Sequence, residues 1–127
     1  MTPNAIQRSQ LTMQLLNEWE IPLKSQIDIL GLPEKTSTRY LSKFSQDTPL
    51  PDDKDIQVRI EHLVGIADAL RTTFPHNANM GKHWMKTPHR RLNKKSPISV
   101  LMDEGLTGLI NVRATLDCSF DWFYNGS

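Results

Sequence analysis

The residues with the clearest capacity for chemistry lie in the first third of the sequence and are of the types that bind nucleic acid. They combine cationic and hydroxyl side chains just after Gly31: Lys35, Thr36, Ser37, Thr38, Arg39 and Lys43. An arginine can donate two hydrogen bonds to a guanine edge, short hydroxyl groups reach bases or phosphates, and a lysine one turn further meets the phosphate backbone. The segment is therefore a candidate DNA-binding surface.

Two short helices must position these side chains. The sequence predicts one helix over 22–30, ended by Gly31, and a second over 34–44. Two helices joined by a tight turn are typical of the helix-turn-helix, in which the first turns of the second helix enter the major groove. A plain helical hairpin with a solvated basic face fits the sequence equally well. A few cations bind DNA weakly, so specific binding requires a dimer that presents two recognition helices.

A basic stretch follows later in the chain, between Asp68 and Asp103, where the sequence contains no acid. Its cations are Arg71, Lys82, Lys86, Arg90, Arg91, Lys94 and Lys95. Several of them fall after Pro88, in a loop expected between two helices. This loop could bind an acidic partner or the DNA backbone, and a solvated loop without a partner is the simpler alternative.

An aromatic cluster lies close to position 120. Phe120, Trp122, Phe123 and Tyr124 are almost adjacent in the sequence. Aromatic clusters that stay in water tend to mark interfaces, so Phe123 and Tyr124 are predicted to contact a partner. The alternative for Phe120 and Trp122 is that they fold back over the last helix.

The sequence offers no recognisable enzyme site. Its histidines, His62, His76, His83 and His89, lack the spacing to Cys118 or to an acid that metal ligands have. It also contains no glycine-rich phosphate loop and no nucleophile motif, although a catalytic triad can be built from distant residues. We therefore expect a binding protein without catalytic residues, metal or cofactor.

Composition and charge favour a globular protein. The 127 residues are 38% hydrophobic, and 15 Lys and Arg against 14 Asp and Glu give a net charge of +1. This balance excludes a general attraction to nucleic acid, so any such binding depends on local clusters. A single cysteine, with no charged-then-apolar leader, predicts a cytoplasmic protein. No apolar run is long enough to span a bilayer, so we expect no membrane partner.

The periodicity of apolar residues predicts an all-α fold. Further helices are expected over 4–19, 53–74, 78–85 and from 96 or 97 to 104, followed by a last helix. The residues expected to face the core are Ile6, Met13, Leu16, Trp19, Leu23, Ile27, Leu30, Tyr40, Leu41, Phe44, Ile56, Ile60, Leu63, Ala67, Leu70, Phe74, Ile98, Leu101, Met102, Leu109, Val112 and Leu116. We expect a helix-turn-helix unit over 1–74 that packs on a second helical unit over 75–127. The long helix over 53–74 belongs to the first unit and connects the two.

The second unit contains a string of residues that resembles a known family. The string is Trp84-x3-Pro88, Leu92-Asn93, Ser96-Pro97-Ile98, Leu101, Gly105-Leu106, and the spaced Leu109, Val112 and Leu116. It resembles the toxin-binding domain of the Xre/MbcA/ParS antitoxin family, and the preceding helices resemble the Xre-like helix-turn-helix domain of those antitoxins. The two resemblances together cover about 15–122. Family members often have a glycine-rich link before the Ser/Thr-Pro, whereas this chain has Leu92-Asn93-Lys94-Lys95.

The resemblance implies a type II antitoxin that silences a cognate toxin by direct binding, commonly a RES-type toxin that consumes NAD. Such an antitoxin also represses its own operon, and we expect a homodimer within a larger toxin–antitoxin complex. The scaffold residues of the toxin-binding domain are then Trp84, Pro88, Pro97 and Gly105. The candidate toxin contacts are Arg90, Arg91, Asp117, Asp121, Trp122, Phe123 and Tyr124.

Two alternatives stay open at this point. The cations of the basic stretch over 82–95 could contact the toxin, DNA or solvent. Asp117 and Asp121 are expected to pair with cations in a toxin pocket built for a phosphate-bearing dinucleotide. The whole chain could instead be a stand-alone helix-turn-helix transcription regulator whose C-terminal unit dimerises or binds a ligand.

Overall fold

All regular structure in the computed structural model is helical over the part of the chain that it describes, which is the backbone of residues 4–125 and the side chains of residues 4–117. The elements, with η for short 3-10 turns, are α1 (Ala5–Glu18), α2 (Leu23–Leu30), η1 (Thr38–Tyr40), α3 (Leu41–Phe44), α4 (Lys54–Thr73), α5 (Ala78–Lys86), η2 (Arg90–Leu92), α6 (Pro97–Glu104) and α7 (Leu106–Asn125). The predicted all-α fold is confirmed. Across this described range, no helix is both long enough and apolar enough to traverse a lipid bilayer.

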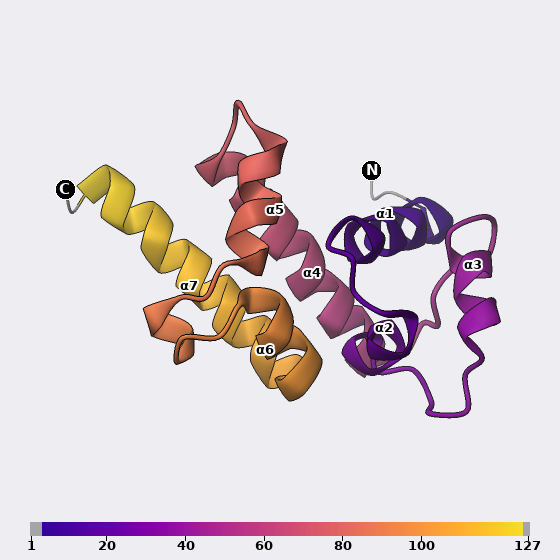
Figure 1. Ribbon diagram of the computed structural model, residues 1–127. Helices are drawn as coiled ribbons and strands as arrows, with labels where there is room; N and C mark the ends of the chain where they lie inside the picture. The colour runs from indigo at the N-terminus through magenta and orange to yellow at the C-terminus, as the bar shows by residue number, and fades with distance from the viewer. Residues whose placement is uncertain (1–3, 126–127) are drawn as a thin grey trace.

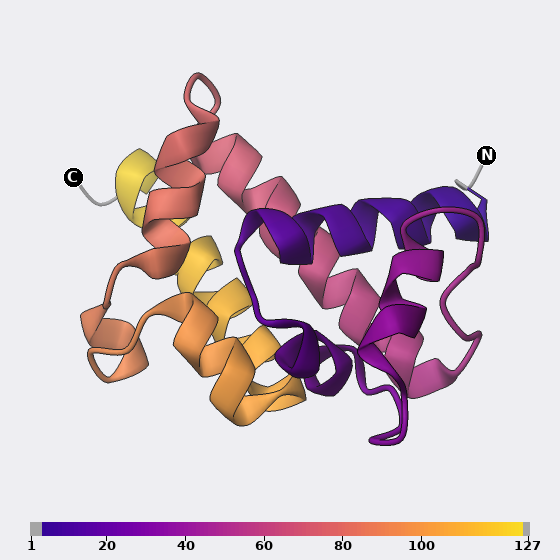
Figure 2. The same cartoon turned by 45° about the vertical axis from the view of Figure 1, so that its right-hand side comes forward.

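Helix α4 is the support that the two halves of the fold share. Figures 1 and 2 show it running between α1–α3 on one side and α5–α7 on the other. The helix begins after Asp53, whose carboxylate accepts hydrogen bonds from the backbone N–H groups of Asp55 (2.9 Å) and Ile56 (3.3 Å). Phe74 caps its other end, so the predicted long helix over 53–74 is confirmed.

The buried face of α4 is broader than the predicted stripe. Ile66 is completely buried although the predicted stripe omits it, whereas Ala67 and Phe74, which were expected in the core, are only half-buried. The cause is that α4 packs against α1 and α2 on one side and against α7 on the other. A helix covered from two sides buries a wider arc than the single stripe of a surface helix.

Helices α1 and α2 form where predicted, but each leaves one predicted core residue in solvent. Helix α1 begins after Asn4, whose side chain accepts a hydrogen bond from the Gln7 N–H (2.7 Å). Helix α2 ends at Gly31 in the left-handed conformation, with φ 76°. The predicted burial of Ile6 and Leu23 is wrong, because each lies in the first turn of its helix at the edge of the packed region.

Arg59 of α4 fixes the end of α2. Its guanidinium donates hydrogen bonds to the carbonyl oxygens of Asp28 (3.1 Å) and Ile29 (3.3 Å), two acceptors at the C-terminal end of that helix. The same side chain pairs with Asp55 at 3.1 Å and is only 17% exposed. A Cβ atom at Gly31 would lie 2.8 Å from Arg59 Nε, so glycine supplies both the backbone conformation and the space for this contact.

The predicted recognition helix over 34–44 is wrong in its first turn. Residues 34–37 form a turn followed by an extended stretch, and the chain becomes helical only at Thr38. The physical reason is Ser37, which has an extended backbone (φ −72°, ψ 139°) and accepts a hydrogen bond from the Arg39 N–H at 3.2 Å. The helical part therefore covers only 38–44, and the connection from α2 is a longer loop rather than a tight turn.

Helix α6 begins as its sequence predicts. The Ser96 hydroxyl accepts a hydrogen bond from the Ser99 N–H (3.2 Å), and Pro97 occupies the first turn, where its missing N–H has no cost. Met102 is exposed, so its predicted burial is wrong. Val100 and Leu101 fill the interface of α6 instead.

Helix α7 closes the C-terminal half by packing on α4 and α6. Leu109, Val112 and Leu116 are completely buried, as predicted. Arg113 of the same helix lies over Gly65 of α4, where a Cβ atom would come within 2.6 Å of Arg113 Nε. Its Nη1 also lies 3.2 Å from His62 Nδ1, so a polar contact accompanies the apolar packing of these two helices.

Candidate functional site

The candidate DNA-binding residues occupy an exposed edge of the N-terminal half. Arg39 and Lys43 lie four positions apart in η1 and α3, are both exposed, and therefore share one face of the helical segment. The other four residues flank or precede that segment: Lys35 and Ser37 are exposed, and Thr36 and Thr38 are half-buried. The structure thus brings two of the predicted cations together on a helical face and leaves Lys35 on the preceding loop.

An aromatic ring that the sequence interpretation placed in the core lies on this edge beside Lys43. Tyr40 is 43% exposed, so its predicted burial is wrong. Lys43 Nζ lies 4.9 Å from the centroid of the Tyr40 ring, within reach of a cation–π interaction. Leu41 and Phe44 already complete the buried face of this short helix, which turns Tyr40 outward. The three-residue spacing of Leu41 and Phe44 was the sequence signal that could have predicted an exposed Tyr40.

The predicted scaffold residue Trp84 is held by His89, which the sequence interpretation did not assign to the scaffold. The two rings are stacked, with centroids 4.5 Å apart and planes inclined by 30°. His89 Nε2 also lies 2.9 Å from the Trp84 carbonyl oxygen, and the His89 N–H donates to the Lys95 carbonyl oxygen at 3.1 Å. Pro88, which precedes His89 in the sequence, is exposed, whereas Pro97 is buried.

The loop after η2 adopts a conformation that glycine would favour. Asn93 and Lys94 both have positive φ, at 57° and 64°. The chain turns back here, because the Lys94 N–H donates to the His89 carbonyl oxygen at 2.9 Å. These positions fall in the segment where the resembling family often has glycine, and of the two residues here Asn93 tolerates the left-handed conformation better than Lys94 does.

Arg91 borders a small polar cleft between η2, α6 and α7, whereas Arg90 is exposed in η2 and does not line it. The cleft has a volume of about 300 Å³, and Glu104 and Asn111 also line it. Beside it, Lys95 Nζ lies 3.6 Å from an Asp103 carboxylate oxygen. Part of the basic stretch is therefore neutralised locally.

The remaining candidate contacts lie along the second half of α7. Asp117 is exposed, on the same helix as the buried Leu116. The side chains of Asp121, Trp122, Phe123 and Tyr124 fall outside those that the structure describes, although the backbone of α7 is helical through Asn125. The predicted role of this segment therefore stays a prediction.

An ion pair connects the two halves of the fold directly. Lys86 Nζ, at the end of α5, lies 2.5 Å from a carboxylate oxygen of Glu20, just after α1. The hydrogen bond from Lys86 and its positive charge hold the pKa of the Glu20 carboxyl below its ordinary value, and the charge of Lys82 acts in the same direction. Both partners are well exposed, so the bridge contributes little to stability.

Among residues 4–117, no group of three His, Cys, Asp or Glu side chains could hold a metal ion. His62 contacts Arg113 and His89 contacts Trp84, so both have packing partners of other kinds.

The comparisons with known proteins concern the C-terminal half. No curated protein matches the chain. A family model does match, over residues 69–118, which run from the end of α4 through α5, η2 and α6 into α7. This range contains Trp84, Pro88, Pro97 and Gly105, the four predicted scaffold residues. Residues 69–118 are similar to the antitoxin Xre/MbcA/ParS C-terminal toxin-binding domain, and this supports an antitoxin role in a toxin–antitoxin system with a cognate toxin as partner.

Proposed function

We propose that the chain is a type II antitoxin whose C-terminal unit, 75–127, binds and neutralises a RES-type toxin that consumes NAD. The observation that carries the proposal is the family match over residues 69–118, which covers all of α5, η2 and α6 together with the end of α4 and the first part of α7. The antitoxin acts by occupying a surface of the toxin, so it needs no catalytic residue of its own.

The toxin contacts proposed are Arg90, Arg91, Asp117, Asp121, Trp122, Phe123 and Tyr124. The exposed position of Arg91 beside α7 supports a surface that continues along this helix. Aromatic side chains bury large apolar areas at interfaces and often dominate their affinity. Asp117 and Asp121 lie four positions apart in the sequence of α7. We assign them to cations in the dinucleotide site of the toxin.

The N-terminal unit, 1–74, is proposed to repress the operon as a homodimer. Arg39 and Lys43 share an exposed face with the Tyr40 ring, and this supports a contact with the DNA backbone and base edges. Because residues 34–37 are not helical, Lys35, Thr36 and Ser37 would reach phosphates from a loop rather than bases from the first turn of a helix. Two copies are required, since so few cations per copy give weak binding.

Co-expression with the product of the adjacent gene tests the proposal. A tagged copy of this chain is expected to co-purify with that product and to restore growth of cells that express it. Cellular NAD should fall when the adjacent gene is expressed alone and recover when this chain is present. Co-purification without a change in NAD would contradict the RES assignment. Failure of both co-purification and rescue, with the chain folded, would contradict the antitoxin role.

A further inference from the structure

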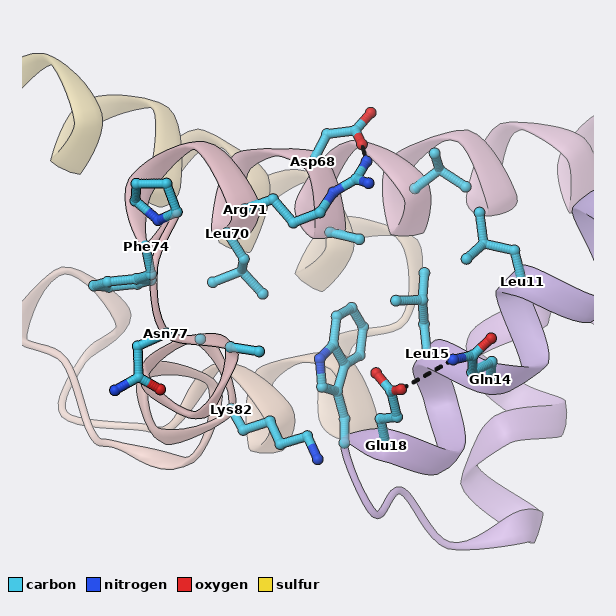
Figure 3. Close-up of a pocket in the computed structure, with 16 residues that line it drawn as sticks. Leu11, Gln14, Leu15, Glu18, Asp68, Leu70, Arg71, Phe74, Asn77 and Lys82 are labelled. Atoms are coloured by element: carbon cyan, nitrogen blue, oxygen red, sulfur yellow. Dashed lines mark hydrogen bonds and ion pairs between the residues drawn. The ribbon is translucent and has the colours of Figure 1, made fainter.

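A pocket opens where α1, α4 and α5 meet, away from the residues assigned to DNA and toxin. It has a volume of about 460 Å³, and Figure 3 shows the lining side chains converging on it from these helices. Its apolar wall includes Leu15, Trp19, Val64, Ala67, Leu70 and Phe74. Trp19 is only 4% exposed, so its ring is held in place by the packed core, whereas Val64, Ala67 and Phe74 are half-buried.

The charged side chains at the edge of this pocket differ in whether they have a hydrogen-bond or ion-pair partner. Asp68 is ion-paired with Arg71, and Glu18 Oε1 accepts a hydrogen bond from Gln14 Nε2 at 3.1 Å. Lys82 extends from α5 toward the end of α1, as Figure 3 shows, and makes no hydrogen bond or ion pair with any residue that the structure describes. Its charge also acts on the Glu20 carboxyl, but its N–H donors are left for a ligand at the mouth.

The dimensions of the pocket favour a small molecule over a segment of a partner protein. Small-molecule sites typically have volumes of about 300–1,000 Å³ and are mostly apolar, with a few polar groups that fix the ligand. An α-helix with its side chains is about 10 Å across, which is wider than a pocket of about 460 Å³ can accommodate. A planar ring, by contrast, can lie against the two aromatic residues of the wall.

We propose that this pocket binds a small planar apolar carboxylate. The ring lies among Trp19, Leu70 and Phe74, and the carboxylate accepts hydrogen bonds from Lys82. Glu18 also lies at the mouth, where its negative charge repels the carboxylate of the ligand. Removing that charge should therefore strengthen binding, whereas removing the charge of Lys82 should weaken it. The ligand would touch α1 and α5 at once and so strengthen the joint that the Glu20–Lys86 ion pair also spans.

Isothermal titration calorimetry of the full chain with 2-naphthoate tests the proposal, and 2-naphthylmethylamine is the matched cationic probe. The naphthoate is expected to bind more tightly than the amine. Lys82→Gln should weaken naphthoate binding about fivefold, the size of one partly exposed ion pair. Glu18→Gln should strengthen it, and the amine should respond to both changes in the opposite sense. Lys54→Gln, at an exposed site outside the pocket, should leave binding unchanged.

A filling substitution tests the location separately. Ala67→Phe places a ring inside the pocket and should abolish naphthoate binding, whereas Ala114→Phe on the exposed face of α7 should not. Thermal unfolding of each variant establishes that it is folded. The proposal is overturned if naphthoate does not bind, if the amine binds as tightly, or if Lys82→Gln and a folded Ala67→Phe both bind naphthoate like the unchanged chain. The measurement needs no toxin, so its result is independent of the antitoxin proposal.

Discussion

Gly108 of α7 packs directly against the backbone carbonyl group of Val100 in α6. A Cβ atom at Gly108 would lie 3.0 Å from the Val100 carbonyl carbon and closer still to its oxygen. The absence of a side chain at this position is what allows the two helices to approach, and this hairpin forms much of the region that matches the toxin-binding domain.

Replacing Gly108 with alanine should therefore destabilise the chain by about 2 kcal/mol, since backbone must move to admit the methyl group. Alanine is the better helix former by about 1 kcal/mol, so the measured loss is the balance of a larger steric cost and this gain. Gly65→Ala is the matched control, because the methyl group there meets only the mobile end of Arg113. Urea unfolding of both variants checks this. Equal stability of the two would contradict the close approach.

Lys94 offers a prediction of the opposite sign. Its φ of 64° is one that glycine adopts without strain, so Lys94→Gly should stabilise the chain by about 0.5–1 kcal/mol. Arg90→Gly, at an exposed position in η2 without positive φ, should have no such benefit. Differential scanning calorimetry would show a higher Tm for the first variant only. A lower Tm for Lys94→Gly would mean that the loop does not adopt this turn.

The Glu20–Lys86 ion pair predicts a pH dependence. The pKa of Glu20 is lower in the folded chain than in the unfolded chain, so its ionised carboxylate stabilises the fold at pH values above its unfolded pKa. This stabilisation is lost as the pH falls through the folded pKa of Glu20. Glu20→Gln should thus lower the Tm slightly at pH 7 and have progressively less effect in acid. Glu34→Gln, on an exposed loop, is the control. A difference that grows in acid would contradict the assigned direction.

Binding to operator DNA should show a salt dependence that Arg39 and Lys43 contribute to. If each neutralises one phosphate, Arg39→Gln and Lys43→Gln should each reduce the slope of log affinity against log salt by about one. Lys24→Gln, on an exposed face of α2 outside the candidate surface, should leave it unchanged. Fluorescence anisotropy over a range of salt concentrations checks this, and an unchanged slope for both variants would remove these residues from the DNA interface.

Much of the fold could be predicted because helix boundaries here are set by short local signals. Asn4, Asp53 and Ser96 each cap a helix with their own side chains, and Gly31 ends α2 through its left-handed backbone. The same kind of signal explains the main error. Ser37 caps the short helical segment, but the apolar spacing after it was extended backwards through residues that form a loop.

The site was less predictable because it depends on contacts between residues distant in sequence. The burial of Ile66 follows from α4 being covered on two sides, which no local pattern encodes. The pocket beside Lys82 forms because α1, α4 and α5 all contribute residues to its lining. The sequence contains no local signal that brings these three helices together. The stacking of His89 on Trp84 was more predictable, since the two residues are only five positions apart in the sequence.

The most direct test of the central claim is growth of cells that express the adjacent gene product together with this chain, either unchanged or with Trp122, Phe123 and Tyr124 replaced by alanine. The account predicts full growth with the unchanged chain and loss of rescue with the triple variant, although that variant is folded and equally abundant. Leu23→Ala, an exposed apolar residue of α2, should still rescue. Full protection by the triple variant would contradict the proposed contact surface, and no protection by the unchanged chain would contradict the antitoxin role itself.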